Sequence, residues 1–257
     1  MQADDRSSRR TGLARALSKL GYCSRSRAAE LVRSGKVQLN GTVRRNPEFP
    51  VVLGRDRIEL SGSRLESAGK RYIMLNKPRG VITTASDEKG RKTVYGLLGT
   101  ETHWVAPVGR LDKASEGLLL LTNDSEWASR ITDPRGHVPK TYHVQIGTVA
   151  DSQLINTMLH GFRVGTDWLQ MKEVRLLRHG KRNSWLEVVL EEGKNRHIRR
   201  MFEHVEVEVL RLVRVAVGAL TLGDLPKGKS RNLTAAEKQQ VDAYLNDQPG
   251  NKSTRRN

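Results

Sequence analysis

Apolar side chains recur at helical spacing in two short runs within the first 35 residues. Leucines stand every three or four positions from residue 13 to residue 20, which predicts a helix that ends at Gly21. Ser24 is a favoured N-cap residue, and the apolar positions after it predict a second helix, which ends at Gly35. We therefore expect a pair of short helices at the start of the folded chain.

After Gly35 the helical spacing gives way to short apolar runs that are typical of strands. Runs at 37–39 and 42–43 flank Asn40-Gly41, a pair that strongly favours a two-residue hairpin turn. Another strand is expected at 57–60. Two helices and a hairpin sheet of this length form a small module with a thin core.

A longer region of strand and helix patterns follows residue 70. Strands are predicted at 72–76, 118–122, 142–146 and 185–190. Helices are predicted at 124–131, 150–160, 195–204 and 234–245. The last two strands alternate apolar and polar side chains, as half-exposed antiparallel strands do. The fold class expected is α+β: a small helix-hairpin domain, followed by a domain with a mixed, mainly antiparallel sheet.

Small polar residues at 61–70 mark a break between the two patterns, as a linker does. Both ends of the chain are polar, basic and nearly free of large apolar side chains, which predicts disordered tails. The expected organisation is a tail at 1–10, a helix-hairpin domain at 11–61, a linker at 62–70, a second domain at 71–246 and a tail at 247–257.

Charge narrows the range of partners. Lysine and arginine outnumber aspartate and glutamate by 45 to 28, which gives a net charge of +17. Such an excess concentrates phosphate polyanions at the surface and releases their counterions on binding. A merely soluble basic protein and a membrane-surface binder are the alternatives, but the basic amphipathic helix typical of the latter is missing from the sequence. Composition favours a nucleic acid without distinguishing RNA from DNA.

The sequence also argues against several other classes. No apolar run approaches the roughly 20 residues of a membrane span, and the polar N-terminus lacks a secretion signal. The single cysteine cannot form an internal disulfide, so we expect a cytoplasmic protein. Glycine-rich nucleotide motifs, metal-ligand spacings and a Ser-His-Asp arrangement are all missing from the sequence. We therefore expect neither a cofactor nor a metal.

The second helix and the hairpin of the small domain carry six basic residues against one acidic residue, Glu30. Any one of these bases is readily explained as part of a solvated face. The cluster as a whole favours a phosphate-binding surface. Its members are Arg25, Arg27, Arg33, Lys36, Arg44 and Arg45.

The segment 108–117 is the first candidate for chemistry. Its two glycines belong to a loop that leads into a strongly apolar strand, so Asp112 is expected at the mouth of a sheet. Flanking Arg110 and Lys113 favour the ionised carboxylate, which can serve as a nucleophile or a base. An aspartate that merely pins the loop through an ion pair is the competing interpretation.

Two further segments are candidates for substrate contact. Residues 192–202 predict a basic helix, capped by Asn195 and packed through one apolar face, which suits phosphate contact or simple solvation. Tyr142 opens a strand after Lys140 and Thr141. Its ring is either a core or cross-strand residue or a stacking platform for a base.

Taken in order, these segments resemble the RsuA/RluB/RluE/RluF family of ribosomal RNA pseudouridine synthases, over about residues 71 to 235. The matching stretches are 75–81, 109–112 with 115–124, 140–142, 192–196 with 198–202, and 210–214. The small domain resembles the S-four RNA-binding domain. The resemblance implies the pseudouridine synthase fold and an isomerase that needs no cofactor or metal.

The resemblance also implies roles for individual residues in a flipped-uridine mechanism. Asp112 would attack C1′ of the ribose or help to remove the C2′ proton, and Arg199 would pair with it. Tyr142 would stack on the uracil, with Leu212 packed against it. Arg110 would hold the flipped nucleotide or fill the gap that it leaves.

Further basic residues of the matching stretches are expected to bind the substrate. Lys77 and Arg79 would shape the site and touch backbone phosphate. The other expected substrate-binding residues are Lys140, Lys194 and Arg196.

Two positions depart from the family pattern. Ala114 stands where an acidic residue is frequent, and His197 stands where many members have glutamine. Both neighbour the working positions, so we expect them to affect the choice of substrate more than the reaction.

The expected partner is ribosomal RNA or a ribosomal assembly intermediate, bound by a monomer without membrane contact. Transfer RNA is the nearest alternative substrate. A non-catalytic RNA-binding or assembly protein is the alternative from another class, and the joint presence of Asp112, Tyr142, Arg199 and Leu212 argues against it.

Overall fold

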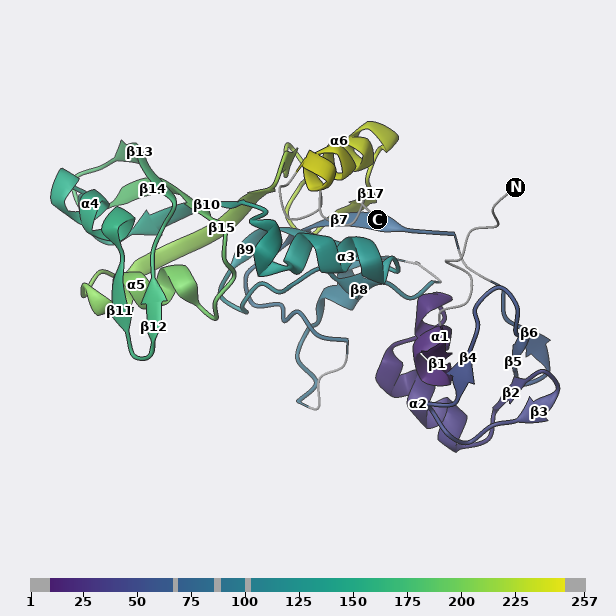
Figure 1. Ribbon diagram of the computed structural model, residues 1–257. Helices are drawn as coiled ribbons and strands as arrows, with labels where there is room; N and C mark the ends of the chain where they lie inside the picture. Colours follow the sequence, from purple (N-terminus) through teal and green to yellow (C-terminus); the bar gives the residue numbers. More distant parts are fainter. Residues whose placement is uncertain (1–9, 67–68, 86–88, 100–102, 248–257) are drawn as a thin grey trace, which may run out of the picture. The chain divides into compact units, whose positions relative to one another are not determined.

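A computed structural model describes residues 10–66, 69–85, 89–99 and 103–247 of the chain. Its contacts divide the chain into two compact units (Figure 1). The first contains residues up to Arg71 together with Thr100–Ala106 and Thr122–Ser125, and the second contains the remainder. The predicted tails lie almost entirely outside the described residues, although Asp247 belongs to the last helix.

The first unit contains the predicted helix pair, α1 (Leu13–Lys19) and α2 (Arg25–Arg33). The side chain of Ser24 caps α2 by accepting a hydrogen bond from the backbone N–H of Arg27 at 3.2 Å. The helices pack on a thin apolar core with a four-stranded sheet in the order β3–β2–β5–β6. The strands of this unit are β1 (Thr11–Gly12), β2 (Val37–Leu39), β3 (Thr42–Val43), β4 (Pro50–Val51), β5 (Ile58–Leu60) and β6 (Ser63–Arg64).

Strand β6 corrects the expected linker. Ser63 and Arg64 pair with β5 in antiparallel register, so the sheet continues into a stretch whose small polar residues predicted a linker. Both β6 residues are exposed, so their contribution is backbone pairing without apolar burial. A search for apolar runs therefore misses this strand.

The described part of the second unit is built on a nine-stranded sheet with the order β13–β14–β10–β15–β9–β7–β17, in which β16 pairs with β15 and β8 with β9. Its strands are β7 (Tyr72–Lys77), β8 (Ala106–Pro107), β9 (Glu116–Thr122), β10 (Lys140–Ile146), β13 (Glu173–His179), β14 (Ser184–Leu190), β15 (Val209–Val217), β16 (Leu220–Thr221) and β17 (Ser230–Asn232). Strands β15 and β9 run parallel, whereas β10 is antiparallel to both of its neighbours. The mixed, mainly antiparallel sheet is confirmed.

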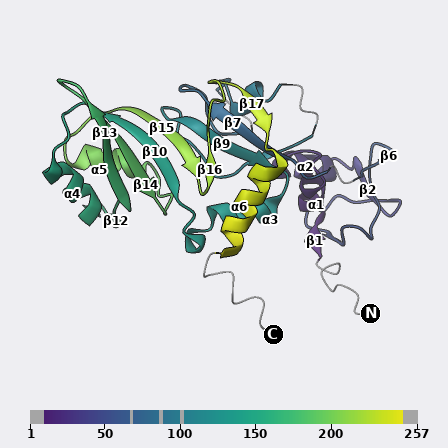
Figure 2. The same cartoon turned by 90° about the horizontal axis from the view of Figure 1, so that it is seen from above.

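Helices cover the sheet in two groups, as Figures 1 and 2 show. Helices α4 (Ser152–His160) and α5 (His197–His204) pack on β10, β14 and β15 through a core that includes Met158, Met201 and Phe202. Helices α3 (Ser125–Thr132) and α6 (Ala235–Asp247) pack near β7 and β9 through a second core. Between the two groups, the parallel strands β9 and β15 hold the middle of the sheet.

Several elements of this unit were not predicted. Strand β15 is the longest strand of the chain that the structure describes, but Arg211 and Arg214 interrupt its apolar pattern. The hairpin of β11 (Phe162–Val164) and β12 (Asp167–Leu169), the edge strand β13 and two 3₁₀ turns, Val94–Leu97 and Pro134–Gly136, also escaped prediction.

The start of α5 also differs from the prediction. Helix α5 begins at His197, and Arg196, not Asn195, occupies the N-cap position in a left-handed conformation. No side chain caps it. None of the described helices is long and apolar enough to cross a membrane.

Candidate active site

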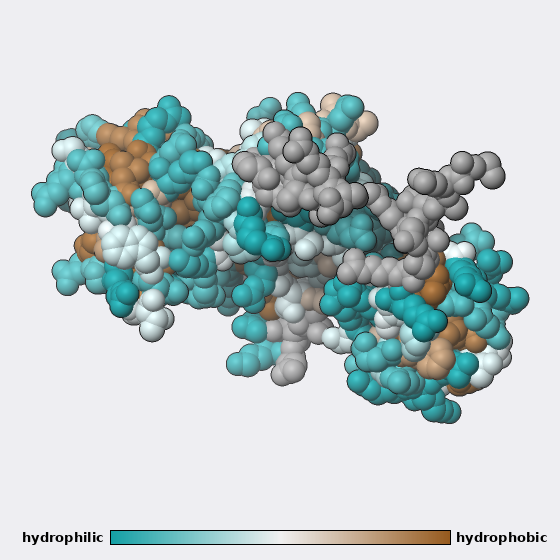
Figure 3. Space-filling model, viewed as in Figure 1, coloured by the Kyte–Doolittle hydropathy of each residue, from teal (hydrophilic) through white to brown (hydrophobic). Residues whose placement is uncertain are grey.

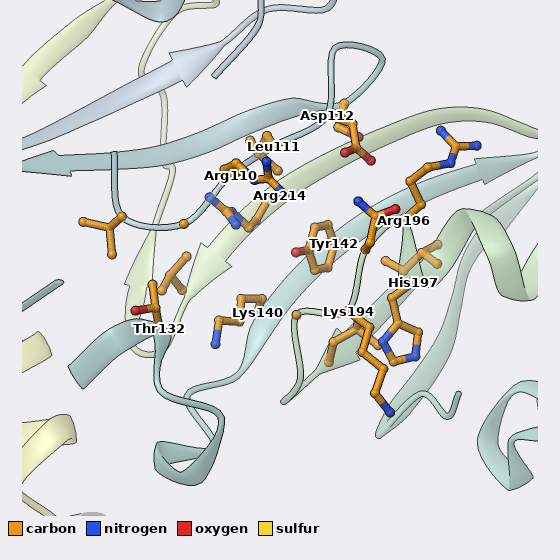
Figure 4. A pocket seen from close by; sticks show the side chains of 18 of the residues that line it. Arg110, Leu111, Asp112, Thr132, Lys140, Tyr142, Lys194, Arg196, His197 and Arg214 are labelled. Atoms are coloured by element: carbon orange, nitrogen blue, oxygen red, sulfur yellow. The ribbon is translucent and has the colours of Figure 1, made fainter. Parts of the chain in front are cut away.

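A pocket of about 290 Å³ opens on the helix-covered face of the large sheet (Figure 4). Its lining comes from the loop before β9, the start of β10, the segment between β14 and α5, and strand β15. Figure 4 shows Tyr142 between the loop that carries Asp112 and the segment that carries Lys194 and His197. The sequence-predicted residues among its lining are Arg110, Asp112, Lys140, Tyr142, Lys194, Arg196 and Leu212.

The backbone of the Asp112 loop is held at every carbonyl from Leu111 to Ser115. Thr83 donates to the Leu111 carbonyl at 2.8 Å, and the backbone N–H of Gly80 donates to the Lys113 carbonyl at 2.7 Å. The donors to the remaining carbonyls are the side chains of Lys77 and Arg199. A loop with its carbonyls fixed in this way keeps one conformation.

Lys77 is fully buried under this loop. Its ammonium donates to the carbonyls of Pro78, Asp112 and Ser115 at 3.2, 3.0 and 2.7 Å. Burial lowers the pKa of Lys77 to about 8, against the opposing pull of the Asp112 charge. The expectation that Lys77 touches phosphate is therefore wrong, because its charge is buried among carbonyls, but its role in shaping the site has a structural basis. Arg79 is exposed and outside the residues that line the pocket.

Arg199 fixes the loop without an ion pair to Asp112. Its guanidinium donates to the carbonyl of Ala114 at 3.1 Å and to that of Val209 at 3.2 Å, while its Nε makes no hydrogen bond. Burial lowers the pKa of Arg199, and the nearby Asp112 charge opposes that shift. The expected direct pairing is absent from this structure, since the guanidinium is engaged by backbone carbonyls.

The carboxylate of Asp112 lines the pocket and is half-buried. Within the part of the chain that the structure describes, it makes no hydrogen bond or ion pair. The competing interpretation of Asp112 as a loop anchor therefore lacks support: its backbone is anchored, whereas its side chain faces the pocket.

Gly117 lets the strand that follows the loop approach β15. It pairs with Arg214 in the parallel register, and a Cβ at Gly117 would lie 2.2 Å from the Arg214 carbonyl oxygen. The φ of Gly117 is also +102°, a region that other residues rarely adopt. A glycine is therefore required where the Asp112 loop joins the centre of the sheet.

Arg214 is a pocket residue that sequence reasoning missed. It is buried, lines the pocket, donates to the Leu118 carbonyl at 2.7 Å and lies across the ladder from Tyr142. Its positive charge, after burial itself, helps to lower the pKa of Lys140 to about 8. An arginine on the apolar face of a strand is the sequence signal that could have indicated it.

The opposite side of the pocket carries basic groups that buried partners do not hold in place. Within the described residues, Lys194 and Arg196 form ion pairs with the exposed carboxylates of Glu192 at 2.9 Å and Glu203 at 2.7 Å, respectively. Next to them His197 is buried; among the residues that the structure describes, its ring nitrogens make no hydrogen bond of good geometry, although the Gln170 backbone faces the ring. Burial and then the charge of Lys194 lower the pKa of His197 to about 4, so its imidazole is neutral at pH 7.

A second, more open hollow of about 470 Å³ shares Arg110, Leu111 and Asp112 with the pocket. Lys89, Arg91 and Lys113 add positive charge to its lining. Asp112 thus lines both the pocket and this more open, basic hollow. No group of three or more potential metal ligands lies together within the described ranges.

In the first unit, five of the six predicted RNA-binding bases are exposed: Arg25, Arg27, Arg33, Lys36 and Arg45. Arg44 is half-buried, with its guanidinium 4.2 Å above the ring of Phe49. Arg27 pairs with Glu30 at 2.9 Å, and Arg45 donates to the Arg33 carbonyl at 3.2 Å. The exposed members belong to α2 and the segments beside the hairpin, so most of the charge faces solvent.

Comparison with known proteins places this site in a family. Residues 71–204 match the RNA pseudouridylate synthase family, and residues 11–57 match the S4 domain. The chain belongs to the RNA pseudouridine synthase family. Its members are isomerases, and the family, the fold class and the S4 domain expected from the ordered motifs are confirmed.

Individual relatives agree over most of the chain. Ribosomal large subunit pseudouridine synthase B of Bacillus subtilis is 37% identical over 88% of this chain and 93% of the relative. An uncharacterised RNA pseudouridine synthase of Aquifex aeolicus is 36% identical over 88% of this chain and 91% of the relative. A crystal structure of a pseudouridylate synthase superposes with a TM-score of 0.62 and 26% identity, covering 90% of this chain and 99% of that one.

Proposed function

We propose that this pseudouridine synthase converts a uridine of ribosomal RNA into pseudouridine in the Asp112 pocket. The observation that carries the proposal is the contrast between the backbone and the side chain of Asp112. The carbonyls of its loop accept hydrogen bonds, whereas its carboxylate lines the pocket without a partner among the described residues. The relative from Bacillus subtilis is named for the large ribosomal subunit, which supports ribosomal RNA as the substrate class.

The reaction begins with a uridine flipped out of its stack into the pocket. Tyr142 stacks on the uracil and Leu212 packs beside it, since both side chains line the same wall. The Asp112 carboxylate then either attacks C1′ or takes the C2′ proton, and the C1′–N1 bond breaks with its electrons leaving on the uracil. The ring rotates and C5 bonds to C1′, while the Asp112–C1′ bond breaks on the first route or the abstracted proton returns to C2′ on the second. The C5 proton is then lost and N1 gains one, so product and substrate are isomers.

The charges around Asp112 suit these steps. The detached uracil carries negative charge, and the cations Lys140 and Arg214 line the pocket that holds it. Lys77 and Arg199 keep the catalytic loop in place by donating hydrogen bonds to its carbonyls. Preorganised cations at the position where negative charge develops lower the barrier without reorganisation.

The first unit contributes affinity. The exposed bases of α2 and the hairpin region would contact backbone phosphate, and each neutralised phosphate steepens the fall of affinity with salt. Replacing Arg25, Arg27 and Arg33 together by glutamine should weaken RNA binding and reduce the slope of log K against log salt by roughly 2 to 3. Filter binding across a salt series measures this slope, and an unchanged slope would exclude these three contacts.

Release of the C5 hydrogen gives a direct assay of the proposed reaction. The chain is incubated with unmodified ribosomal RNA that carries tritium at C5 of its uridines, and tritium released to water is counted. Release that saturates at one uridine per RNA is expected. Release from transfer RNA alone would move the substrate to that class, and binding without release from either RNA would indicate a non-catalytic RNA-binding protein.

We further propose that the protein acts in the cytoplasm as a monomer. Light scattering of the purified protein should give a mass near 28.9 kDa, and a stable dimer would contradict this.

A further inference from the structure

The ring of Trp168 is exposed and is not needed to fill the core of the fold. The residue is 56% exposed, the largest value among the exposed large hydrophobic residues that the structure describes. Trp127, by contrast, is buried against Tyr72, and Trp185 lies between the guanidinium groups of two arginines. Within the described residues the Trp168 ring contacts no other ring or cation and its indole N–H has no acceptor. The ring thus contributes little visible packing to the fold.

The backbone that carries this ring is nevertheless held firmly. Trp168 lies on β12 of the β11–β12 hairpin, which Figure 1 shows beside α5. Arg200 joins the two strands of the hairpin by donating to the Asp167 carboxylate at 2.7 Å and to the Val164 carbonyl at 2.9 Å. Leu169, the next residue after Trp168, is fully buried in the core. A fixed backbone under an exposed ring is the arrangement of a preformed contact surface.

Two backbone contacts place strand β12, which carries Trp168, beside residues that line the Asp112 pocket. Lys194, which lines the pocket, donates from its ammonium to the Trp168 carbonyl at 2.8 Å. Two residues further along, the backbone of Gln170 faces the ring of His197, another pocket residue. The hairpin is therefore one side chain away from the pocket on the side opposite the Asp112 loop.

The surroundings of the ring are basic. Arg163 lies directly across the hairpin from Trp168, is exposed, and makes no ion pair within the described ranges. The nearby Asp167 is already paired with Arg200. An aromatic face beside a cation without an ion pair suits a nucleotide, whose base stacks while its phosphate meets the positive charge. Figure 3 shows that hydrophilic side chains cover much of the visible surface, with a few apolar patches among them.

We propose that Trp168 is the stacking platform for an unpaired base next to the flipped uridine, with Arg163 at that nucleotide's phosphate. The site takes a single-stranded ribonucleotide of any sequence, because every base has a π face. The inference rests on the proposed function, which puts the target uridine in the pocket. A flanking base held at the rim keeps the strand open beside the flipped nucleotide, so the platform acts on RNA affinity and leaves the chemistry to Asp112.

The first test separates affinity from chemistry in the full-length protein. Trp168→Ala should raise KM for unmodified ribosomal RNA about 5- to 150-fold, the range measured for loss of one base stack, with kcat changed less than about twofold. Trp168→Phe should recover most of the loss, because a smaller ring still stacks. Leu176→Ala, which truncates another exposed apolar residue on β13, is the control and should leave KM unchanged.

The second test does not depend on turnover. Binding of oligouridylate should quench tryptophan emission of the wild-type chain, and the quenched component should be missing in Trp168→Phe. An unaltered KM in Trp168→Ala, equal quenching in Trp168→Phe, or a fall in kcat and melting temperature that phenylalanine does not rescue would each overturn the proposal. If the wild-type chain releases no tritium from any RNA, the proposed function fails, and the quenching result alone decides the stacking site.

Discussion

The two sides of the pocket differ in how their polar groups are satisfied. On one side, each carbonyl from Leu111 to Ser115 accepts a hydrogen bond, and the donors include the fully buried Lys77. On the other side, Arg196 adopts a left-handed conformation without a side-chain cap, and the buried His197 ring has no hydrogen bond of good geometry among the described residues.

This difference indicates that one side of the pocket performs the reaction and the other binds the RNA. A reacting carboxylate must be held within a fraction of an ångström, so the side that carries Asp112 is fixed by buried donors. Groups that recognise a polyanion must be accessible to it, and on the side that carries Lys194 and Arg196 the ion pairs are made with exposed carboxylates, which a polyanion can replace. Substitutions on the first side should lower kcat, and substitutions on the second should raise KM.

Asp112→Ala should give the largest effect, because it removes the group proposed to react. The single-turnover rate of pseudouridine formation should fall at least about 1,000-fold, while the Kd for RNA changes less than about threefold. Asp224→Ala, which removes an exposed aspartate outside the pocket lining, is the matched control. A rate within tenfold of the wild type would break the assignment of chemistry to this side.

Lys77→Met tests whether the hydrogen bonds from Lys77 to the Asp112 loop are needed for catalysis and stability. Methionine fills much of the same space but leaves the carbonyls of Pro78 and Ser115 without their lysine donor. We expect a fall in kcat of about 100-fold and a loss of roughly 2 to 4 kcal/mol in the free energy of unfolding, measured by urea titration. Lys181→Met, at an exposed lysine in the β13–β14 turn, should change neither quantity.

His197→Gln tests the side of the pocket opposite Asp112 through the pH dependence of the free energy of unfolding. The folded pKa of His197 is lowered to about 4, so between about pH 6.5 and pH 4 the unfolded chain binds a proton that the folded chain does not. The free energy of unfolding of the wild type should therefore fall across this window, by up to roughly 3 kcal/mol from this residue. Glutamine does not titrate, so the variant should lack this part of the decline. Parallel acid titrations of the two proteins would contradict the assignment.

Arg196→Ala should give the smallest effect and the cleanest contrast with Asp112. Arg196 is exposed, and within the described residues its ion pair with Glu203 lies at the surface, so stability should change little. Loss of one phosphate contact should raise KM about three- to tenfold at low salt, with kcat unaltered. A fall in kcat with constant KM would reverse the proposed roles of the two sides.

Much of this architecture could be predicted from local patterns. Ser24 before α2 and the apolar face of α5 follow from short-range periodicity and capping, and both are present. The pocket members Asp112, Tyr142 and Leu212 came from the order of motifs along the chain, and the structure gathers them around one cavity.

What escaped prediction depends on contacts distant in sequence. Lys77 looks like a surface lysine, and only the packing of the loop over β7 buries its charge. Arg211 and Arg214 interrupt the apolar pattern of β15, so this central strand was not predicted. A buried arginine needs partners such as the Leu118 carbonyl, which the sequence does not reveal. Asn195 was preferred as a cap on residue type, whereas the chain turns through Arg196 instead.

The most direct test of the central proposal is a map of pseudouridines in ribosomal RNA from cells that lack this gene, complemented with either the wild-type or the Asp112→Ala chain. The account predicts that a pseudouridine is missing without the gene, returns with the wild-type chain and stays missing with the variant. A full set of pseudouridines without the gene, or restoration by Asp112→Ala, would contradict it.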